Sequence, residues 1–165
     1  MDAERVFYRY GAVMLRHAQL LMKNDSMAED AVQETLIRVI RLNPSLRDEI
    51  HEKAWLLAVT GNICRDMLRK RKRRGEVAMP EWLELPSEGT EPGEAVSQKE
   101  RDARLLRAVM DLPVKYREPV LLVYYHELTN MQAAEAMGIT DSAFRTRLMR
   151  ARDLLRRTLG EEAEL

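Results

Sequence analysis

The clearest chemistry in this chain of 165 residues belongs to a run of arginines near its carboxyl end. Residues 140–159 include six arginines and two aspartates, whereas the whole chain has 27 basic and 27 acidic residues. Clustered guanidinium groups bind phosphates because each neutralised phosphate releases a counterion, and one guanidinium can also donate two hydrogen bonds to guanine. The run therefore predicts DNA binding, with a solvated basic helix face as the alternative.

Two helices joined by a tight turn must position these arginines. Thr129 can cap the first helix, and Gly138 supplies the backbone freedom that a helix carboxyl end requires. The second helix begins after Thr140 or Asp141. The arginines lie largely off its apolar stripe, so the layout predicts a helix-turn-helix whose second helix enters the major groove. The apolar positions of the two helices are Met131, Ala134 and Met137, then Phe144, Leu148, Ala151, Leu154 and Leu155.

Two amphipathic helices are predicted at the start of the chain. The first begins after Asp2 and ends at Met22. The second begins at a capping box formed by Ser26 and Glu29 and continues to about Leu42. The apolar residues expected on their core faces are Val6, Phe7, Tyr10, Val13, Met14, Ala18, Leu21, Met22, Ala28, Ala31, Val32, Leu36, Val39 and Ile40.

A loop and a basic helix are expected next. Because proline cannot continue a helix, Asn43-Pro44 ends the second helix, and the loop extends to about Glu52. The third helix begins at Lys53 and ends with seven basic residues between positions 65 and 74. This basic end predicts a second nucleic-acid contact, and a solvated helix terminus that favours cations is the alternative.

An acidic segment divides the chain into two parts. Residues 1–74 have 15 basic and 10 acidic side chains, whereas residues 75–104 have three and eight. Most of the acidic segment lacks a helical period and contains several prolines and glycines, so we expect a flexible linker. No strand pattern competes with helix, which predicts an all-α fold of two small helical domains. The predicted domains are residues 1–75 and 101–160, and the predicted linker is residues 76–100.

The second domain is predicted to contain four helices, of which the last two form the helix-turn-helix. The other two occupy about residues 100–110 and 117–126. Pro119 lies near the start of the latter, where its missing N–H is tolerated.

Composition excludes several classes of function. The single cysteine, Cys64, allows no internal disulfide, and the three histidines are scattered, so no metal-ligand spacing is present. There is no Gly-rich phosphate loop and no pairing of a nucleophile with a base, so we expect no catalysis, no cofactor and no small-molecule substrate. There is also no apolar run of about 18 residues and no secretory signal, so the expected location is cytoplasmic.

Three segments follow one another in a recognisable order. They are AEDAVQETLIRVIR (28–41), AWLLAVTGNICRDMLRKRKRR (54–74) and LPVKYREPVLLVYYHELTNMQAAEAMGITDSAFRTRLMRARDLLRR (112–157). In this order they resemble region 2.2, regions 2.3 and 2.4, and region 4 of the sigma-70 family of bacterial transcription initiation factors. The resemblance is closest to the extracytoplasmic function (ECF, group 4) branch, and it covers nearly the whole chain.

The resemblance implies two sets of site residues in the first domain. In the family, the region 2.2 helix docks on core RNA polymerase, whereas from the residues alone such a polar cluster is most often a solvated face. The corresponding residues are Asp30, Gln33, Glu34 and Ile37. The loop after this helix and the third helix correspond to the surface that binds the minus-10 element, although Trp55 is equally a candidate for the core. The implied minus-10 residues are Asn43, Ser45, Arg47, Asp48, Trp55, Asn62, Arg65, Arg69, Arg71 and Arg73.

In the second domain, the resemblance assigns the last helix to the minus-35 element. The implied residues are Asp141, Arg145, Thr146, Arg147, Met149 and Arg150. Ser142-Ala143-Phe144 departs from the Gly-Thr-Val that is common in the family, so the preferred minus-35 sequence stays open. The implied partners are bacterial core RNA polymerase, promoter DNA and an anti-sigma factor, either soluble or membrane-anchored.

Two functional hypotheses of different classes follow. The first is a promoter-specificity subunit that binds polymerase and recognises two promoter elements. The second is an autonomous repressor or activator that uses only the helix-turn-helix and binds duplex DNA as a dimer. The absence of an extra dimerisation helix counts against the second hypothesis.

Overall fold

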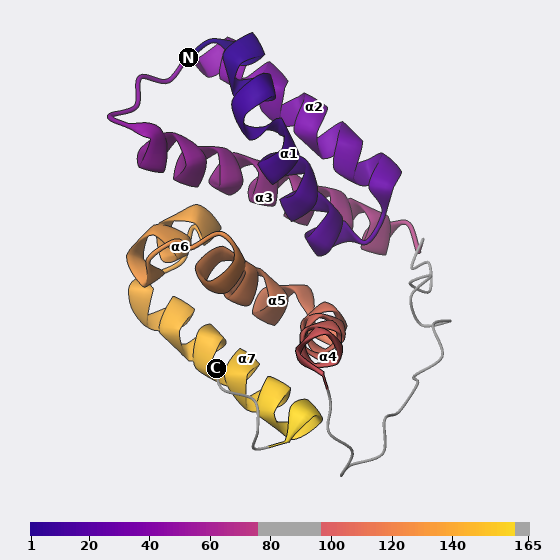
Figure 1. The fold of residues 1–165 in the computed structure, drawn as a ribbon. Coiled ribbons are helices and arrows are strands. Elements are labelled where there is room, and N and C mark those ends of the chain that lie inside the picture. Colours follow the sequence, from indigo (N-terminus) through magenta and orange to yellow (C-terminus); the bar gives the residue numbers. More distant parts are fainter. Residues whose placement is uncertain (76–96, 161–165) are drawn as a thin grey trace.

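The fold is all-α, as predicted. The computed structural model describes residues 1–75 and 97–160, and within these ranges the secondary structure is helical, in two groups that lie side by side (Figure 1). The N-terminal group is α1 (Ala3–Met22), α2 (Asp25–Leu42) and α3 (Glu49–Arg73). The C-terminal group is α4 (Gln98–Asp111), α5 (Val114–Val120), the π-helical segment η2 (Leu121–Tyr125), α6 (Asn130–Met137) and α7 (Asp141–Leu159).

The first helix has the predicted bounds and a narrower buried face than predicted. The Asp2 side chain accepts a hydrogen bond from the backbone of Glu4 at 3.0 Å, which is the expected cap. Val6 and Met14 are fully buried against α2 and α3, but Phe7 is 53% exposed. Consecutive helical residues point about 100° apart, so Phe7 is turned away from the face that Val6 presents to the core. Ile40 of α2 is also exposed, and both residues were wrongly placed in the core.

Two helix starts differ from the prediction. The cap of α2 is Asn24, whose side chain accepts a hydrogen bond from the backbone of Met27, so the predicted Ser26–Glu29 capping box is wrong. The cap of α3 is Asp48, which accepts from the backbone N–H of His51, so this helix begins four residues before Lys53. In both places an Asn or Asp closer to the preceding helix satisfies the free N–H groups first.

The C-terminal group contains the predicted helix-turn-helix. Thr129 and Gln132 form a reciprocal capping box on α6, Gly138 ends that helix at φ 66°, and Thr140 caps α7. Met131 is 74% exposed, so its placement on the core face was wrong.

The helix before the helix-turn-helix differs from the prediction at both ends. It begins at Val114, three residues earlier than expected, so Pro119 lies inside α5 rather than at its start. The π-helical turns of η2 follow directly, and the N–H of His126 donates to the carbonyl of Leu121 at 2.9 Å. Proline inside a helix removes one backbone hydrogen bond, and the rare π-helical turns of η2 begin two residues after it.

The two groups of helices pack against each other, with α3 on α6 and α1 on α5 (Figure 1). One apolar cluster runs through both groups and includes Leu21 and Leu57 from the first and Leu122 and Phe144 from the second. A smaller cluster around Val6 and Met14 belongs to the N-terminal group. Most of the predicted linker, residues 76–96, lies outside the described residues.

No helix within the described ranges is both long enough and apolar enough to cross a lipid bilayer.

Candidate nucleic-acid and polymerase interfaces

The first turns of α7 present an exposed polar face. Arg145 is exposed and pairs with Asp141 one turn earlier at 3.1 Å, and the hydroxyl of Thr146 donates to the carbonyl of Ser142 at 3.0 Å. The opposite side of the helix is anchored by Phe144, which is fully buried. The predicted minus-35 residues that are exposed on this face are Asp141, Arg145, Thr146, Met149 and Arg150. Such a face can offer two guanidinium groups to base edges or phosphates.

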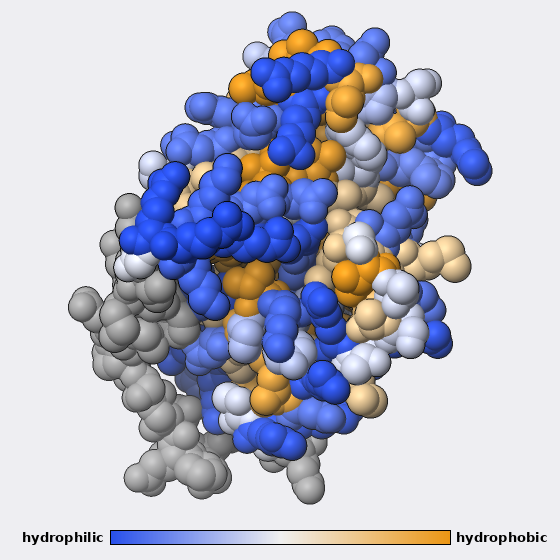
Figure 2. Space-filling model, turned by 180° about the vertical axis from the view of Figure 1, so that it is seen from behind, coloured by the Kyte–Doolittle hydropathy of each residue, from blue (hydrophilic) through white to orange (hydrophobic). Residues whose placement is uncertain are grey.

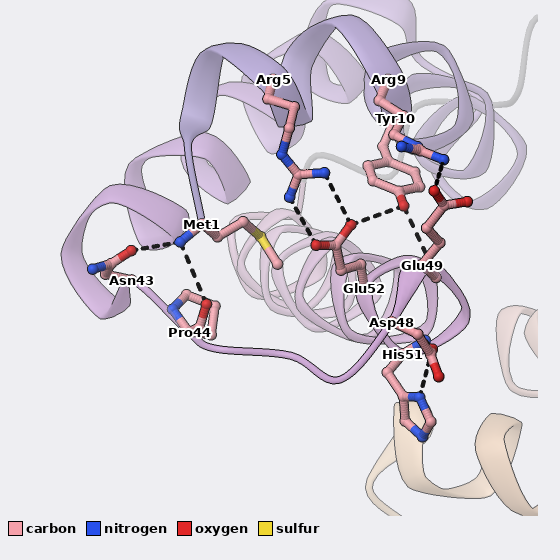
Figure 3. Close-up of polar contacts among 10 residues, drawn as sticks. All are labelled: Met1, Arg5, Arg9, Tyr10, Asn43, Pro44, Asp48, Glu49, His51 and Glu52. Atoms are coloured by element: carbon pink, nitrogen blue, oxygen red, sulfur yellow. Dashed lines mark hydrogen bonds and ion pairs between the residues drawn. The ribbon is translucent and has the colours of Figure 1, made fainter.

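The loop between α2 and α3 is held at both of its ends (Figure 3). At its start, the N-terminal ammonium of Met1 donates to the side-chain carbonyl of Asn43 at 2.6 Å. At its end, the carboxylate of Asp48 caps α3 and contacts the ring of His51 at 2.7 Å, and these hydrogen bonds lower the pKa of Asp48. Of the four predicted minus-10 residues in this loop, Asn43 and Asp48 therefore support its shape, while Ser45 and Arg47 are exposed.

Polar contacts from α1 hold the start of α3 next to this loop (Figure 3). Arg5 donates to Glu52 at 2.7 Å, and Arg9 pairs with Glu49. The hydroxyl of Tyr10 also donates to Glu52, at 3.0 Å. The hydrogen bonds from Arg5 and Tyr10 lower the pKa of the Glu52 carboxyl. These contacts fix the start of α3, where the loop ends, against α1.

The predicted minus-10 residues of α3 lie along one helix in different environments. Trp55 is half-buried against the smaller apolar cluster, so part of its ring belongs to the core. Asn62 is exposed and accepts a hydrogen bond from Arg65 at 2.7 Å. Arg69 is exposed and pairs with Asp66, and Arg73 is exposed, while Arg71 is half-buried and directs a guanidinium nitrogen to the sulfur of Met27 at 3.5 Å.

Arg65 differs from these neighbours because the C-terminal group covers it. Its guanidinium pairs with Glu118 of α5, and the two side chains are only 15% and 2% exposed. Burial raises the pKa of Glu118, and the positive charges of Arg65, Arg147 and Arg117 hold part of that rise back. Arg147, predicted to contact the minus-35 element, is half-buried and directs its charge toward this carboxylate.

The predicted polymerase-binding residues share an exposed face of α2. Asp30, Gln33 and Ile37 are exposed, and Glu34 is partly exposed and pairs with Arg38 at 3.8 Å. Figure 2 shows hydrophobic residues at the end of the molecule that the N-terminal helices form, and smaller hydrophobic patches between hydrophilic residues over the rest of that face. The large apolar side chains of α2 that solvent reaches are Ile37, Ile40 and Leu42.

Sequence reasoning missed the polar residues that join the two groups. Arg117 is buried and donates to three backbone carbonyls, and His17 and His126 place ring nitrogens 3.0 Å apart in the interior. The one local sign of a buried polar contact in the sequence was His17, a polar residue directly before Ala18 on the apolar side of α1. No three His, Cys, Asp or Glu side chains converge on a metal-sized site in the described parts of the chain.

Comparisons with known proteins agree with this geometry. The family model described as Sigma-70 region 2 matches residues 6–74, and the model described as Sigma-70, region 4 matches residues 102–155. The first match spans α1 to α3, and the second spans α4 to most of α7.

Individual proteins that are similar to this chain agree with these two family matches. The ECF RNA polymerase sigma factor SigE of Mycolicibacterium smegmatis is 32% identical over 149 residues, which cover 90% of this chain and 58% of SigE, less than two thirds of its length. The ECF RNA polymerase sigma factor SigW of Bacillus subtilis is 30% identical over 149 residues, which cover 86% of this chain and 80% of SigW. The sigma factor RpoE of Bartonella quintana, solved in complex with the anti-sigma factor NepR, has the same fold, with a TM-score of 0.71 and 22% identity over 97% of this chain and 98% of that chain. The present chain therefore belongs to the sigma-70 family, as one of its ECF RNA polymerase sigma factors.

Proposed function

We propose that this group 4 sigma factor binds bacterial core RNA polymerase and directs it to promoters that have a particular pair of minus-10 and minus-35 elements. The N-terminal domain, residues 1–75, contacts polymerase through α2. It contacts the minus-10 element through α3 and the loop between α2 and α3. The C-terminal domain, residues 101–160, contacts the minus-35 element through α7. The chain itself performs no catalysis.

The observation that carries this proposal is the exposed face of α7. The second helix of the helix-turn-helix is anchored by the buried Phe144 and presents Arg145 and Arg150 to solvent. The two halves of the chain also match sigma regions 2 and 4 in that order. Guanidinium groups on an exposed recognition helix can distinguish guanine from other bases in the major groove.

An anti-sigma factor is the proposed regulator. The fold neighbour RpoE was solved with the anti-sigma factor NepR bound, and this supports a partner of the same class for the present chain. Co-purification of the chain with a second protein would identify that partner.

The test of the function combines polymerase binding with transcription. The purified chain should co-elute with bacterial core RNA polymerase on a sizing column, and the complex should start RNA synthesis from a subset of a randomised promoter library. Replacing Asp30 and Gln33 with alanine should weaken co-elution, whereas Glu29→Ala, an exposed residue of the same helix outside the proposed contact, should not. If the chain does not bind polymerase but binds specific duplex DNA without it, the proposal is refuted in favour of an autonomous regulator.

A further inference from the structure

Two tyrosines of the C-terminal group each hold an arginine of α7. The hydroxyl of Tyr124, in η2, accepts a hydrogen bond from Nε of Arg152 at 2.7 Å, and the guanidinium carbon lies 5.5 Å from the centre of the tyrosine ring. Tyr116 of α5 forms a hydrogen bond with Arg150, and α5 packs beside α7 (Figure 1). Arg152 and the two tyrosines are not among the predicted minus-35 residues.

The contact with Tyr124 holds Arg152 without neutralising its charge. A phenol hydroxyl is a neutral partner, whereas Arg145, on the same side of α7, pairs with the carboxylate of Asp141. In the described part of the chain, Arg152 takes part in no ion pair. The hydrogen bond uses Nε, so it also orients the two terminal nitrogens of the guanidinium, and such a pair of donors matches two oxygens of a phosphate.

The surroundings of Tyr116 are also positively charged. The ammonium of Lys115 lies 4.9 Å from the centre of the Tyr116 ring. Burial raises the pKa of the Tyr116 hydroxyl, but hydrogen bonds with Arg150 and Lys115, and the charges of both, lower it overall. Two cations beside one hydroxyl produce a local positive potential, which attracts an anion such as a phosphate.

Arg150 and Arg152 lie on opposite flanks of α7. The residue between them, Ala151, is fully buried, and consecutive helical residues point about 100° apart, so the two arginines point about 200° apart. An α-helix with its side chains is about 10–12 Å across, and the major groove is about 12 Å wide. A helix in the groove therefore has one DNA strand beside each flank, and a tyrosine-held arginine lies on each flank of α7.

Arg152 lies further along α7 than the residues proposed to reach base edges. Seven residues separate it from Arg145, so the two lie on the same side of the helix, about 10 Å apart along its axis. In DNA-binding motifs of this kind the first residues of the recognition helix contact base edges, whereas the end of such a helix can contact the backbone. The position of Arg152 therefore suits a phosphate better than a base.

The segment η2 places the Tyr124 hydroxyl at the surface. Leu121 and Leu122 of η2 are buried in the core, whereas Tyr124 is 41% exposed. The segment is π-helical, and such turns are rare in proteins and are found frequently at functional sites. The hydroxyl thus lies where the guanidinium that it holds can meet DNA.

We propose that Tyr124 positions Arg152 to bind a backbone phosphate at one edge of the major groove in the minus-35 element. Tyr116 holds Arg150 toward the opposite strand in the same way. Both statements rest on the proposed function, because they take α7 as the helix that enters the groove. A guanidinium that is already held in place loses less freedom on binding, so the tyrosines raise affinity for every promoter without changing which base sequence is preferred.

Tyr124→Phe and Arg152→Ala are the two principal test variants. The first removes the hydroxyl and keeps the ring, and the second removes the guanidinium. Tyr125→Phe is the matched control, because it makes the same chemical change at the next position, where the ring packs on His126 at a centroid distance of 4.9 Å. All three variants should keep the far-UV circular dichroism of the wild type.

Fluorescence anisotropy measures the binding of each variant, in complex with core polymerase, to a labelled duplex that contains the selected minus-35 element. Tyr124→Phe should weaken binding about three- to tenfold, and by the same factor for duplexes with base substitutions in that element, while Tyr125→Phe should bind as the wild type. In an Arg152→Ala background, Tyr124→Phe should have no further effect. A purely structural role of Tyr124 would give equal losses in both backgrounds. That result, or wild-type affinity in Tyr124→Phe, would overturn the proposal.

Duplexes in which one phosphate at a time is replaced by a neutral methylphosphonate locate the contacts. One replacement should weaken binding of the wild type but not of Arg152→Ala, and a replacement on the other strand should weaken binding of the wild type but not of Arg150→Ala. If no replacement separates Arg152→Ala from the wild type, or if both replacements lie on one strand, the proposal is wrong.

The outcome can be separated from that of the proposed function. If the complex with polymerase starts transcription but Tyr124→Phe and Arg152→Ala weaken binding independently, only the positioning role fails. If the chain does not bind polymerase, the same variants are compared with the full chain and the duplex alone. Coupling between the two variants there would support the positioning role while the proposed function fails, and a lack of duplex binding in both forms would overturn both.

Discussion

Acidification should destabilise this protein through its buried histidine pair. Burial, together with the charge of Lys53, lowers the pKa of His126 to about 4. Burial, His126 and Arg65 lower the pKa of His17 well below its ordinary value. Histidine in an unfolded chain has a pKa of about 6.5, so between pH 4 and pH 6.5 the unfolded chain binds more protons than the folded one. Stability therefore rises with pH across this window and is lost as the pH falls through it.

The size of the effect follows from the pKa of His126. At pH 5 the imidazole of His126 is almost wholly neutral in the folded chain and almost wholly charged in the unfolded chain. Proton linkage then removes about 2 kcal/mol from the free energy of unfolding relative to pH 7.5. His17 acts in the same direction, so this figure is a lower bound for the pair.

One neighbouring group opposes the histidines. Burial raises the pKa of Glu118, so the folded chain retains this proton above the pH at which the unfolded chain loses it, and Glu118 favours the folded state at low pH. The wild type and a His126 variant share this contribution, so a difference between the two chains isolates His126.

The assay is urea unfolding followed by circular dichroism at pH 7.5, 6 and 5. Between the first and last pH values, the wild type should lose about 2 kcal/mol more than His126→Gln, because the variant has no imidazole to protonate at this site. His51→Gln, which removes an exposed imidazole at the start of α3, is the control for a histidine outside the interior, and its loss should differ from that of the wild type by much less than the loss in His126→Gln does. Equal losses in the wild type and His126→Gln would refute the reasoning.

Three further predictions concern α7. Phe144→Ala should lower the free energy of unfolding by about 3–5 kcal/mol, because it empties a fully buried aromatic site; a urea midpoint close to that of the wild type would contradict this. Thr140→Ala should cost about 1 kcal/mol in the same assay, because the hydroxyl caps α7 at the backbone of Ala143, and Thr140→Ser should restore most of the loss. Arg145→Ala should reduce discrimination at one minus-35 base pair by about 1–3 kcal/mol in competition binding with base-substituted promoters. Arg157→Ala, at an exposed position near the end of the same helix, should instead weaken binding to all of these promoters equally. Uniform weakening by Arg145→Ala would show that Arg145 contacts only phosphate.

Local signals were sufficient to predict most of the helices. Apolar residues at helical spacing located α1, α2 and the pair α6 and α7, and the turn at Gly138 was correctly predicted because few other residues adopt its positive φ. The errors at the starts of α2 and α3 arose where two candidate caps lay within a few residues of each other. In such places the packing of the preceding helix decides, and the sequence pattern alone does not contain that information.

The contact between the two halves could not be predicted from the sequence. In the sequence, Arg65 belongs to a run of basic residues, and Glu118 is an acidic residue directly before a proline. Nothing in either pattern indicates that the two side chains pair. The two are 53 positions apart, and His17 and His126 are 109 positions apart, so no periodicity relates them. Only the packing of the C-terminal helices on α1 and α3 gives these side chains a common environment, and with it their burial and the shifted pKa values of Glu118 and His126.

The hydrogen bond from Arg117 to Leu21 can form only late in the synthesis of the chain. The Arg117 guanidinium completes the carboxyl end of α1 at Leu21, yet 96 residues separate the two in the chain. At translation rates of about 5–20 residues per second, the ribosome adds Arg117 about 5–20 s after Leu21. During that interval the N-terminal helices leave the ribosome without their cover, so the side of α3 that later receives α6 is open to any chaperone or polymerase that reaches the nascent chain first.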